Sequence, residues 1–535
     1  METRTIRKVT FVEFELATPH FLSATIMPRS YGLVLVASIL KERGFDVRVY
    51  CDHIAPVDLR RVRESDLVCV SPLGASANKS FAFADHVRRA WGIPVVAGGT
   101  FATYLPDLCL EHFDYVIRNE GDEAVLELVA CLDAGGDLGA IPGLSFRTPG
   151  GAFRHNLARP GPWRFDAAQD LSLIEGYDTR SPWWHVLTER KLRWVVLQAS
   201  RGCPFHCDYC IAPVMYGRGY RTRTVDAVMA DLEDKLRYGR YFLFMDNCFA
   251  GNRRETKELL RRIIDREIGA TFIAFVRHEI ASDAELLDLL RRAGFTQLYI
   301  GAESLNDEVF TRMNKRQTVE RLVRSIETIR RHDIDVTLSF QAGNDEDDAG
   351  ALERAVDFGL EHDLSGVYFI STWSWPDSPS AVFDRRRMIL KSLDYTSGHF
   401  VTHFPLRMRP STLQRAILAA QRRFWSLARL PSLLARGRLD RALGLAVQRH
   451  ALSLFEEPVA RYVEYLSEIE EGYYDAAERL DLAKIAARDL RWDGEYDTLY
   501  RGRLIGNFTG LEVADAPSLP RSAEAGPDPA QRITS

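Results

Sequence analysis

Short apolar runs rich in β-branched and aromatic residues alternate with helical patterns over the first 140 residues of the chain. This order predicts a parallel sheet of about five strands that is covered by helices on both faces. An α/β, doubly wound, flavodoxin-like domain fits the pattern. The expected strands are Val9–Glu15, Asp46–Cys51, Asp66–Pro72, Pro94–Gly98 and Asp114–Arg118, and the expected helices are Gly32–Glu42, Asn78–Trp91 and Glu123–Leu132.

A second alternating series begins near residue 191. Its strand patterns, most of them separated by a helical pattern such as Ala284–Ala293 or Val319–Arg331, predict six βα units. Right-handed crossovers would curl these units into a partial barrel, with ligand chemistry at the carboxyl ends of the strands. The expected strands are Trp194–Ala199, Tyr241–Asp246, Thr271–Arg277, Gln297–Glu303, Asp335–Gln341 and Gly366–Trp373.

The remaining segments divide the chain around these two series. Turn residues gather near residues 135 and 150, and weakly periodic stretches follow, which favours a linker. After Pro376 apolar residues at helical spacing predict the helices Ser411–Leu427, Leu439–Phe455 and Pro458–Ala487. The expected organisation is a first domain over 1–140, a linker over 141–190, a barrel over 191–376, a mainly helical region over 377–513 and a disordered tail over 514–535.

The composition is that of a globular protein. Of the 535 residues, 46% are apolar and 27% are charged, which argues against a disordered or fibrous chain. The sequence shows neither an uncharged apolar run of transmembrane length nor a signal-peptide pattern, so we expect a cytoplasmic protein.

The charge is distributed unevenly. The segment Leu406–His450 contains ten arginines and one acid, so an anionic partner would be expected to contact the C-terminal helices. Leu427, Leu430, Leu433 and Leu434 lie among these arginines, and peripheral membrane contact is therefore an alternative to an ordinary solvated helix face. We expect no nucleic acid partner.

The strongest chemical signal follows the first barrel strand. Cys203, Cys207 and Cys210 lie within eight residues, and three thiolates at this spacing can hold three irons of a [4Fe-4S] cube and leave its fourth iron open. Eight cysteines in the whole chain are too few for a disulfide scaffold. A zinc site completed by His206 is the alternative, and it is disfavoured because His206 and Cys207 are sequence neighbours.

The CxxxCxxC triplet, with an aromatic residue before its last cysteine, resembles the signature of the radical S-adenosylmethionine (SAM) enzymes, and the likeness covers roughly residues 190–375. The resemblance implies a cluster whose open iron binds SAM, a 5'-deoxyadenosyl radical, and an external electron donor such as flavodoxin or ferredoxin. By position it also implies that Tyr209 lies along the adenine and that Asp246, Arg277, Glu303 and Gln341 contact the amino group, ribose or carboxylate of SAM. A structural role is the alternative for each of these five residues.

The first domain resembles the cobalamin-binding domain that precedes many radical SAM modules, because of its segments Val95–Thr103 and Asp114–Glu123. The resemblance implies that glycines at a strand end let the corrin approach the backbone and that a neighbouring loop wraps the nucleotide tail. The Asp-x-His-x-x-Gly motif is missing, so we expect cobalt without a protein histidine ligand, and a domain that has lost cobalamin is the alternative. The residues assigned to cobalamin are Ser71, Gly98, Gly99, Glu120 and Gly121.

Together these resemblances imply a radical SAM enzyme that uses a [4Fe-4S] cluster, SAM and cobalamin. The favoured activity is methyl transfer to an unactivated carbon of a small-molecule or lipid-like substrate. A ring-forming or rearranging enzyme without methyl transfer and a non-catalytic iron–sulfur or cobalamin sensor are alternatives. A tRNA methylthiotransferase is disfavoured because Cys51, Cys69, Cys109 and Cys131 are too scattered to hold its second cluster.

Three further residues have both a functional and a structural interpretation. His399 and His403 follow the barrel and could face the substrate, but structural histidines are the favoured interpretation. Cys248 is expected to be a buried small residue and not a catalytic thiol.

Overall fold

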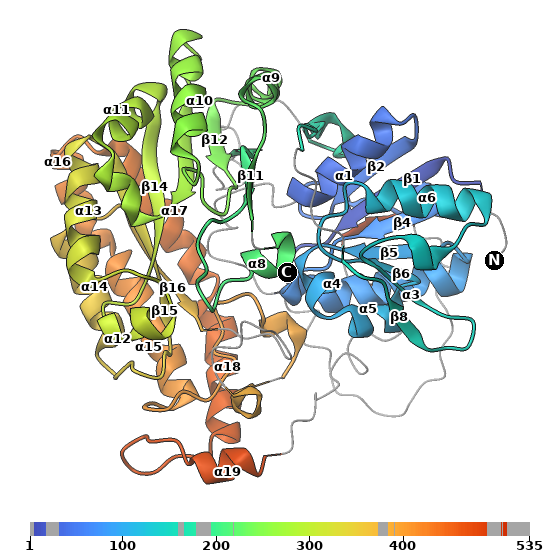
Figure 1. Cartoon of the computed structure of the whole chain (residues 1–535). Coiled ribbons are helices and arrows are strands. Elements are labelled where there is room, and N and C mark those ends of the chain that lie inside the picture. Colours follow the sequence, from blue (N-terminus) through green and yellow to red (C-terminus); the bar gives the residue numbers. More distant parts are fainter. Residues whose placement is uncertain are drawn as a thin grey trace.

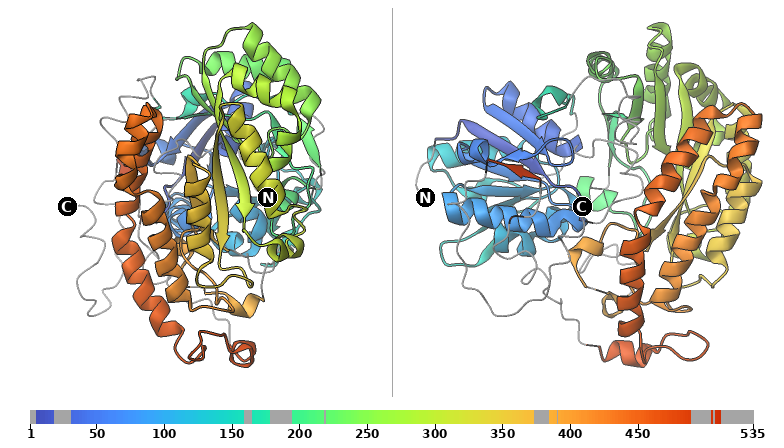
Figure 2. Two further views of the ribbon diagram at one scale, coloured as in Figure 1. Left: turned by 90° about the vertical axis from the view of Figure 1, so that its left-hand side faces the viewer. Right: turned by 180° about the vertical axis from the view of Figure 1, so that it is seen from behind.

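The computed structural model consists of two α/β bodies that lie side by side, with the C-terminal helices packed on the second body (Figures 1 and 2). In the part of the chain that the structure describes, no helix is both long and apolar enough to cross a membrane. The described residues are 5–17, 31–158, 165–177, 194–217, 219–372, 384–389, 391–488, 504 and 507–510.

The first body is a seven-stranded sheet in the order β2-β1-β4-β5-β6-β7-β8. The first five strands are parallel, and β7 and β8 add an antiparallel edge. The strands are β1 (Lys8–Glu13), β2 (Asp46–Cys51), β4 (Leu67–Val70), β5 (Val95–Gly98), β6 (Tyr115–Ile117), β7 (Leu144–Arg147) and β8 (Phe153–His155). The helices are α1 (Tyr31–Glu42), α2 (Leu59–Arg63), α3 (Ala77–Trp91), α4 (Thr100–Tyr104), α5 (Pro106–His112) and α6 (Ala124–Ala134).

This body confirms the predicted doubly wound domain. All four residues of β4 are buried, as expected of a central parallel strand with both faces covered. The prediction was wrong in one respect, because β7 and β8 belong to the sheet although they lie in the segment predicted as a linker. These strands are only four and three residues long, too short for an alternating pattern to be distinguished from a loop.

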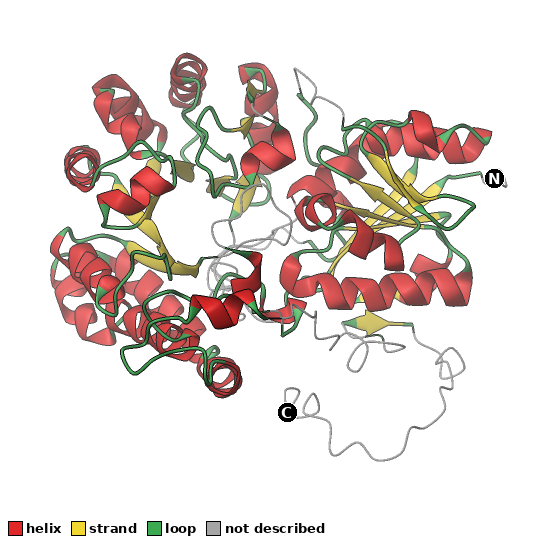
Figure 3. Cartoon of the chain, turned by 60° about the horizontal axis from the view of Figure 1, so that its bottom comes forward, coloured by secondary structure: helices red, strands yellow, loops and turns green. Residues whose placement is uncertain are grey.

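The second body is the predicted partial barrel of six parallel strands in the order β16-β15-β14-β13-β12-β9. Helices cover the outer side of the curved sheet (Figure 3). The strands are β9 (Val195–Leu197), β12 (Tyr241–Phe244), β13 (Thr271–Val276), β14 (Phe295–Glu303), β15 (Asp335–Ala342) and β16 (Gly366–Ser371). The helices are α9 (Val225–Lys235), α10 (Arg253–Asp265), α11 (Ala284–Ala293), α12 (Asp307–Arg312), α13 (Val319–Arg331) and α14 (Ala351–Glu361).

The barrel helices begin and end at local sequence signals. Asp283 caps α11 by accepting a hydrogen bond from the Leu286 amide, and Asn252 caps α10 in the same way. Helix α11 ends at Gly294, whose φ is +102°, and a Cβ there would lie 2.2 Å from the Ala270 carbonyl oxygen. This close approach allows β14 to begin directly beside β13.

The C-terminal region contains α15 (Pro410–Phe424), α16 (Leu430–Ala435), α17 (Leu439–Ser453), α18 (Glu456–Ile469), α19 (Leu482–Ala486) and the short strand β17 (Phe508–Thr509). β17 returns to the first body and pairs with β3 (Val57–Asp58). The predicted helix Pro458–Ala487 was too long, because the chain turns at Gly472 with φ +79° and the Glu470 carboxylate is buried against Ser411. The predicted tail lies outside the described residues.

The arginines between residues 406 and 450 are largely paired with acids of the same chain. Seven of the ten form ion pairs within the described residues, so much of the positive charge docks the C-terminal helices onto the barrel. Leu433 is buried, whereas Leu427 and Leu434 are exposed, and membrane contact stays a prediction. The paired arginines are Arg409, Arg422, Arg423, Arg436, Arg438, Arg441 and Arg449.

A buried ion cluster ties the segment before the barrel to the start of the barrel sheet. Asp231 of α9 lies 2.8 Å from Arg223 Nη1 and 3.0 Å from Lys235 Nζ, and all three side chains are almost completely buried. Lys235 also donates to the Gln169 side chain and to the Val196 carbonyl, both at 3.0 Å. One carboxylate therefore balances two buried cations that hold three segments together.

We expect Asp231→Asn to destabilise the protein by about 3–5 kcal/mol, because it leaves Arg223 and Lys235 buried without an opposing charge. Urea unfolding followed by circular dichroism measures the change. Asp234→Asn on the same helix is the matched control, since the half-exposed Asp234–Arg237 pair should contribute about 0–1 kcal/mol. Equal midpoints for the two variants would contradict the role of the cluster.

Candidate functional site

The cysteine loop extends from the carboxyl end of the first barrel strand. It is framed by the antiparallel hairpin of β10 (Ser200–Gly202) and β11 (Tyr220–Thr222), with α8 (Ala212–Tyr216) between them. Gly202 has φ +79°, and a Cβ at this position would lie 2.0 Å from the Gly219 carbonyl oxygen. Only glycine fits there, and it turns the chain into the loop that carries the cysteines.

Cys203, Cys207 and Cys210 are free thiols, each partly exposed. The amide of Cys210 donates to the Cys207 carbonyl at 3.1 Å, which closes a tight turn between the last two cysteines. A hydrogen bond from the Cys248 thiol lowers the pKa of Cys203 to about 7, whereas burial raises the pKa of Cys210 to about 11. Cys248 is itself buried, as predicted.

The donor set fits an iron–sulfur cube better than a single metal ion. Among the described residues, no three His, Cys, Asp or Glu side chains converge on a point where one ion could bind. A zinc ion would need such convergence, whereas each cysteine of a [4Fe-4S] site holds a different iron. Three separate thiols on one loop therefore suit the cluster that the sequence predicts.

Arg277, a predicted SAM contact at the end of β13, braces the cysteine loop. Its guanidinium lies 3.3 Å from Cys207 Sγ and 4.0 Å above the centre of the Phe205 ring. It also donates to the Lys315 carbonyl at 2.7 Å and pairs with Glu279 at 2.6 Å. The guanidinium therefore connects the end of β13 to both the Cys207 sulfur and the Phe205 ring.

Tyr209 and Glu303, two further predicted SAM contacts, meet on the other side of the loop. The Tyr209 hydroxyl donates to Glu303 Oε1 at 2.9 Å. Lys315 Nζ lies 2.8 Å from the same oxygen and 3.0 Å from the Tyr209 hydroxyl. Glu303 has φ +67°, a strained value for a glutamate at the end of a strand. Lys315, which is not among the predicted site residues, is nearly fully buried and joins these groups.

Asp246 lies beneath the cysteine loop. It is buried, and its carboxylate accepts hydrogen bonds from the Ala199 amide at 3.2 Å and from the hydroxyl of Ser200, the first residue of β10. Burial raises the pKa of Asp246 to about 7. Gln341 borders a small cavity of about 50 Å³ together with Glu303. The assignment of these side chains to SAM stays a prediction, and the structure adds a supporting role for Asp246.

A cavity of about 350 Å³ lies between the two bodies, in the region where α8 faces the first domain (Figure 1). The barrel side contributes Gln198, Arg201, Met245 and Asn247 to its wall, and Met245 and Asn247 directly flank Asp246. The cavity therefore reaches from the first domain to the barrel end that carries the cysteines. All five predicted cobalamin residues, Ser71, Gly98, Gly99, Glu120 and Gly121, line it.

The two glycines after β5 fit the approach of a large flat ligand. A Cβ at Gly98 would have only the Ile117 carbonyl oxygen within 4 Å, at 3.8 Å, so the space above this residue is open. Gly99 has φ +89°, and a Cβ there would lie 2.9 Å from the Ser71 hydroxyl. Because these two residues have no side chain, the corrin could approach their backbone closely in the cavity where it is expected.

The loop after β6 docks the first domain onto the cysteine hairpin. Arg201 Nη1 lies 3.1 Å from Glu120 Oε1, and Arg201 also pairs with both carboxylate oxygens of Asp122 at 2.9 Å. Arg221 forms a second forked pair with Glu120 at 2.8 Å. Asn119 donates to the Val214 carbonyl in α8 at 2.6 Å. The predicted cobalamin residue Glu120 therefore also holds the two domains together.

The two histidines after the barrel are structural. His403 is completely buried, with Nε2 2.9 Å from the Gly343 carbonyl oxygen, and His399 is also buried. Burial lowers the pKa of both histidines to about 4, so both rings are neutral near neutral pH. The structure therefore supports the favoured interpretation, in which both residues are structural histidines.

Two family models match the chain. The model described as B12 binding domain matches residues 27–129, and the model described as Radical SAM superfamily matches residues 197–358. These ranges include the cobalamin residues assigned above and the three cysteines.

Curated relatives match much of the chain at low identity. The anaerobic magnesium-protoporphyrin IX monomethyl ester cyclase of Rubrivivax gelatinosus is 24% identical over 423 residues, which cover 73% of this chain and 72% of the relative. The hopanoid C-2 methylase of Rhodopseudomonas palustris is 25% identical over 338 residues, which cover 61% of this chain and 58% of the relative.

A solved structure has a similar fold. It is the cobalamin-dependent S-adenosylmethionine radical enzyme OxsB with aqua-cobalamin and S-adenosylmethionine bound. The TM-score is 0.64 at 15% identity, and the match covers 90% of this chain and 78% of OxsB. With both domain matches, the cysteine loop and the shared cavity, the chain belongs to the cobalamin-dependent radical SAM enzymes, whose cofactors are a [4Fe-4S] cluster, SAM and cobalamin.

Proposed function

We propose that this enzyme transfers a methyl group to an unactivated carbon of a small-molecule or lipid-like substrate. The observation that carries the proposal is the cavity lined by both domains, which places the predicted cobalamin loops beside the barrel end that bears the cysteine loop. The hopanoid C-2 methylase relative supports this reaction class. The cyclase relative keeps ring closure without methyl transfer as a second candidate.

When bound, the cluster and SAM supply radical chemistry at an unactivated carbon, and cobalamin supplies a transferable methyl group. The chain itself holds and orients these groups. Arg277 keeps a positive charge 3.3 Å from Cys207 Sγ, and Asp246 fixes the backbone just before the cysteine loop. The proposal includes an external electron donor, such as flavodoxin or ferredoxin, that reduces the cluster.

The Tyr209, Glu303 and Lys315 triad sets the polar character of the barrel mouth. The ammonium group of Lys315 balances the charge of the Glu303 carboxylate. The Tyr209 hydroxyl is hydrogen-bonded to both groups, which fixes the position of its ring. Burial raises the pKa of Tyr209 well above its usual value, so the phenol stays protonated. A rigid, protonated aromatic at this position suits the stacking of a flat base.

Replacing Cys203, Cys207 and Cys210 together by alanine should abolish the brown cluster colour and the bound iron, because no other described thiols lie on that loop. Anaerobic reconstitution with iron and sulfide, followed by absorption spectra and iron analysis, measures the effect. Cys131→Ala, a partly exposed thiol in α6, is the control and should retain the cluster. A triple variant that keeps its iron would refute the assignment of the cluster ligands.

Gly98→Val should weaken the binding of hydroxocobalamin at least about tenfold, because a branched side chain would project into the open space above this residue. The bound cobalamin is measured by its visible absorption after gel filtration, and the iron content should not change. Gly150→Val in the exposed turn between β7 and β8 is the control. Normal cobalamin binding by the Gly98 variant would contradict the position of the corrin.

The reaction class is tested by the fate of SAM. Reconstituted enzyme, reductant, hydroxocobalamin and SAM should give both S-adenosylhomocysteine and 5'-deoxyadenosine, since radical methylation consumes SAM in two ways. The triple cysteine variant should form no 5'-deoxyadenosine and no methylated substrate, because it lacks the cluster ligands. Formation of 5'-deoxyadenosine without S-adenosylhomocysteine would contradict methyl transfer and favour the ring-closing alternative.

A further inference from the structure

A second cavity, of about 780 Å³, lies at the opposite end of the barrel from the cysteine loop. Residues at the amino-terminal ends of all six barrel strands line it, and α17 closes it from the other side. None of the predicted cofactor residues belongs to its wall. The strand-end residues are Trp194, Tyr241, Thr271, Gln297, Asp335 and Ser365.

The walls of this barrel-floor cavity are mainly aromatic and aliphatic. The Tyr299 and Tyr368 rings stack with centroids 6.3 Å apart, and Trp425 continues the row at 5.7 Å from Tyr368. Trp194 and Tyr241 form an edge-to-face pair at 5.6 Å elsewhere on the wall. Flat aromatic walls of this kind favour a flat apolar ligand.

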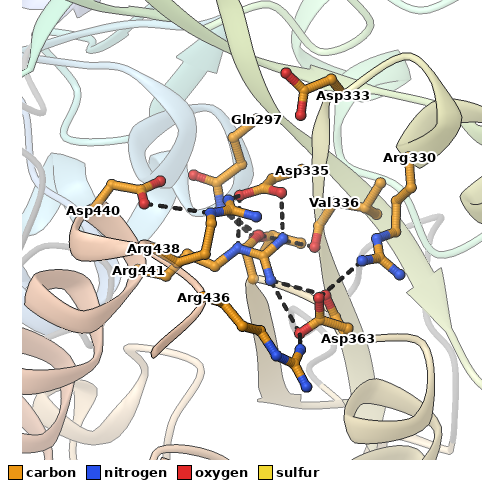
Figure 4. A network of polar contacts seen from close by, with 12 residues as sticks. Gln297, Arg330, Asp333, Asp335, Val336, Asp363, Arg436, Arg438, Asp440 and Arg441 are labelled. Carbon is orange, nitrogen blue, oxygen red and sulfur yellow. Dashed lines mark hydrogen bonds and ion pairs between the residues drawn. The ribbon is translucent and has the colours of Figure 1, made fainter. Parts of the chain in front are cut away.

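The charged residues on the wall neutralise one another. Asp335 pairs with Arg438 and Arg441, Arg441 also lies 3.2 Å from Asp363, and Asp440 lies 3.5 Å from Arg438. Figure 4 shows that these side chains form one continuous network between α17 and the starts of the strands. The cavity therefore offers no unbalanced charge to a ligand and favours a neutral one.

The same network fixes α17 in place. Arg438 and Arg441 belong to the N-terminal end of this helix, and they anchor it to Asp335 at the start of β15. These ion pairs fix the N-terminal end of α17 against the start of β15, beside the cavity.

Gly444 faces this space from the middle of α17. A Cβ at this residue would have no atom within 4 Å, so the side chain position is empty. Glycine is unfavourable in the interior of a helix, and a larger residue would both stabilise the helix and fill the void. Its presence here keeps the cavity wide.

Gln448, one turn further along α17, provides an unmatched polar atom. Its Nε2 donates to the Tyr368 hydroxyl at 3.0 Å. Its Oε1 is buried and accepts no hydrogen bond from any described residue, although Gln448 lines the cavity and is only 7% exposed. A buried acceptor without a donor is costly, and a ligand with a hydroxyl or N–H group would satisfy it.

We propose that the barrel-floor cavity is a second ligand site, separate from the cobalamin cavity and the cysteine loop, that binds a neutral, flat, apolar molecule through its hydroxyl or N–H group to Gln448. The neutral phenols of the wall agree with this ligand, since burial raises the pKa of Tyr299 to about 12. The proposal does not depend on the reaction that the enzyme catalyses.

Calorimetric titration of the full, reconstituted protein with 2-naphthol and 2-methoxynaphthalene tests the site. These probes share a ring system, but only 2-naphthol carries a hydrogen-bond donor. We expect 2-naphthol to bind roughly five- to tenfold more tightly, and Gln448→Leu to remove this preference while both probes still bind.

Gly444→Trp should fill the cavity and abolish binding of both probes, whereas Ala446→Trp, an exposed position on the same helix, should leave binding unchanged. Gly444→Leu is the smaller variant if the tryptophan disturbs folding, and an unfolding temperature no lower than that of the wild type, with unchanged iron content, confirms that each variant is intact. The proposal is overturned if neither probe binds the wild-type protein, if the folded Gly444 variants bind as well as the wild type, or if Gln448→Leu keeps the preference for 2-naphthol.

Discussion

The pairing of Arg201 with Glu120 and Asp122 is the interaction on which the arrangement of the two domains depends. Arg201 stands two residues before the first cluster cysteine, and the two carboxylates stand on the loop that lines the cobalamin cavity. These charges are largely buried, so the loss of one partner would leave another without compensation. Together with the Arg221–Glu120 pair, this guanidinium fastens the loop after β6 to the hairpin that carries the cysteine loop.

Contacts from the C-terminal half strengthen the same arrangement. Asn78 at the start of α3 donates to the side chains of Ser392 and Asp394, in the segment that follows the barrel. Further along the chain, Phe508 of β17 stacks on Phe83 of the first domain at 6.1 Å. The C-terminal region therefore contacts both bodies.

The sequence predicts those parts of the fold that local patterns determine. Buried parallel strands are continuous apolar runs, and α11 and α13 have the predicted bounds because capping residues mark their ends. Polar partners far apart in the sequence cannot be predicted in this way: Lys315 donates a hydrogen bond to Tyr209, and Arg441 forms an ion pair with Asp335, each across 106 positions. The cysteine loop was predictable from spacing alone, whereas the bracing of that loop required the folded barrel.

The arginine-rich segment shows why charge along a sequence is a weak guide to partners. Ten arginines within one segment suggest an anionic surface, yet Arg438 and Arg441 are directed inward to Asp335 at the floor of the barrel. Asp335 lies 103 and 106 residues before these two arginines, so a window along the sequence shows the cations without the acid that pairs with them. Burying these charges costs free energy, and their mutual pairing offsets that cost. As a result, α17 is fastened across the barrel-floor cavity and does not occupy it.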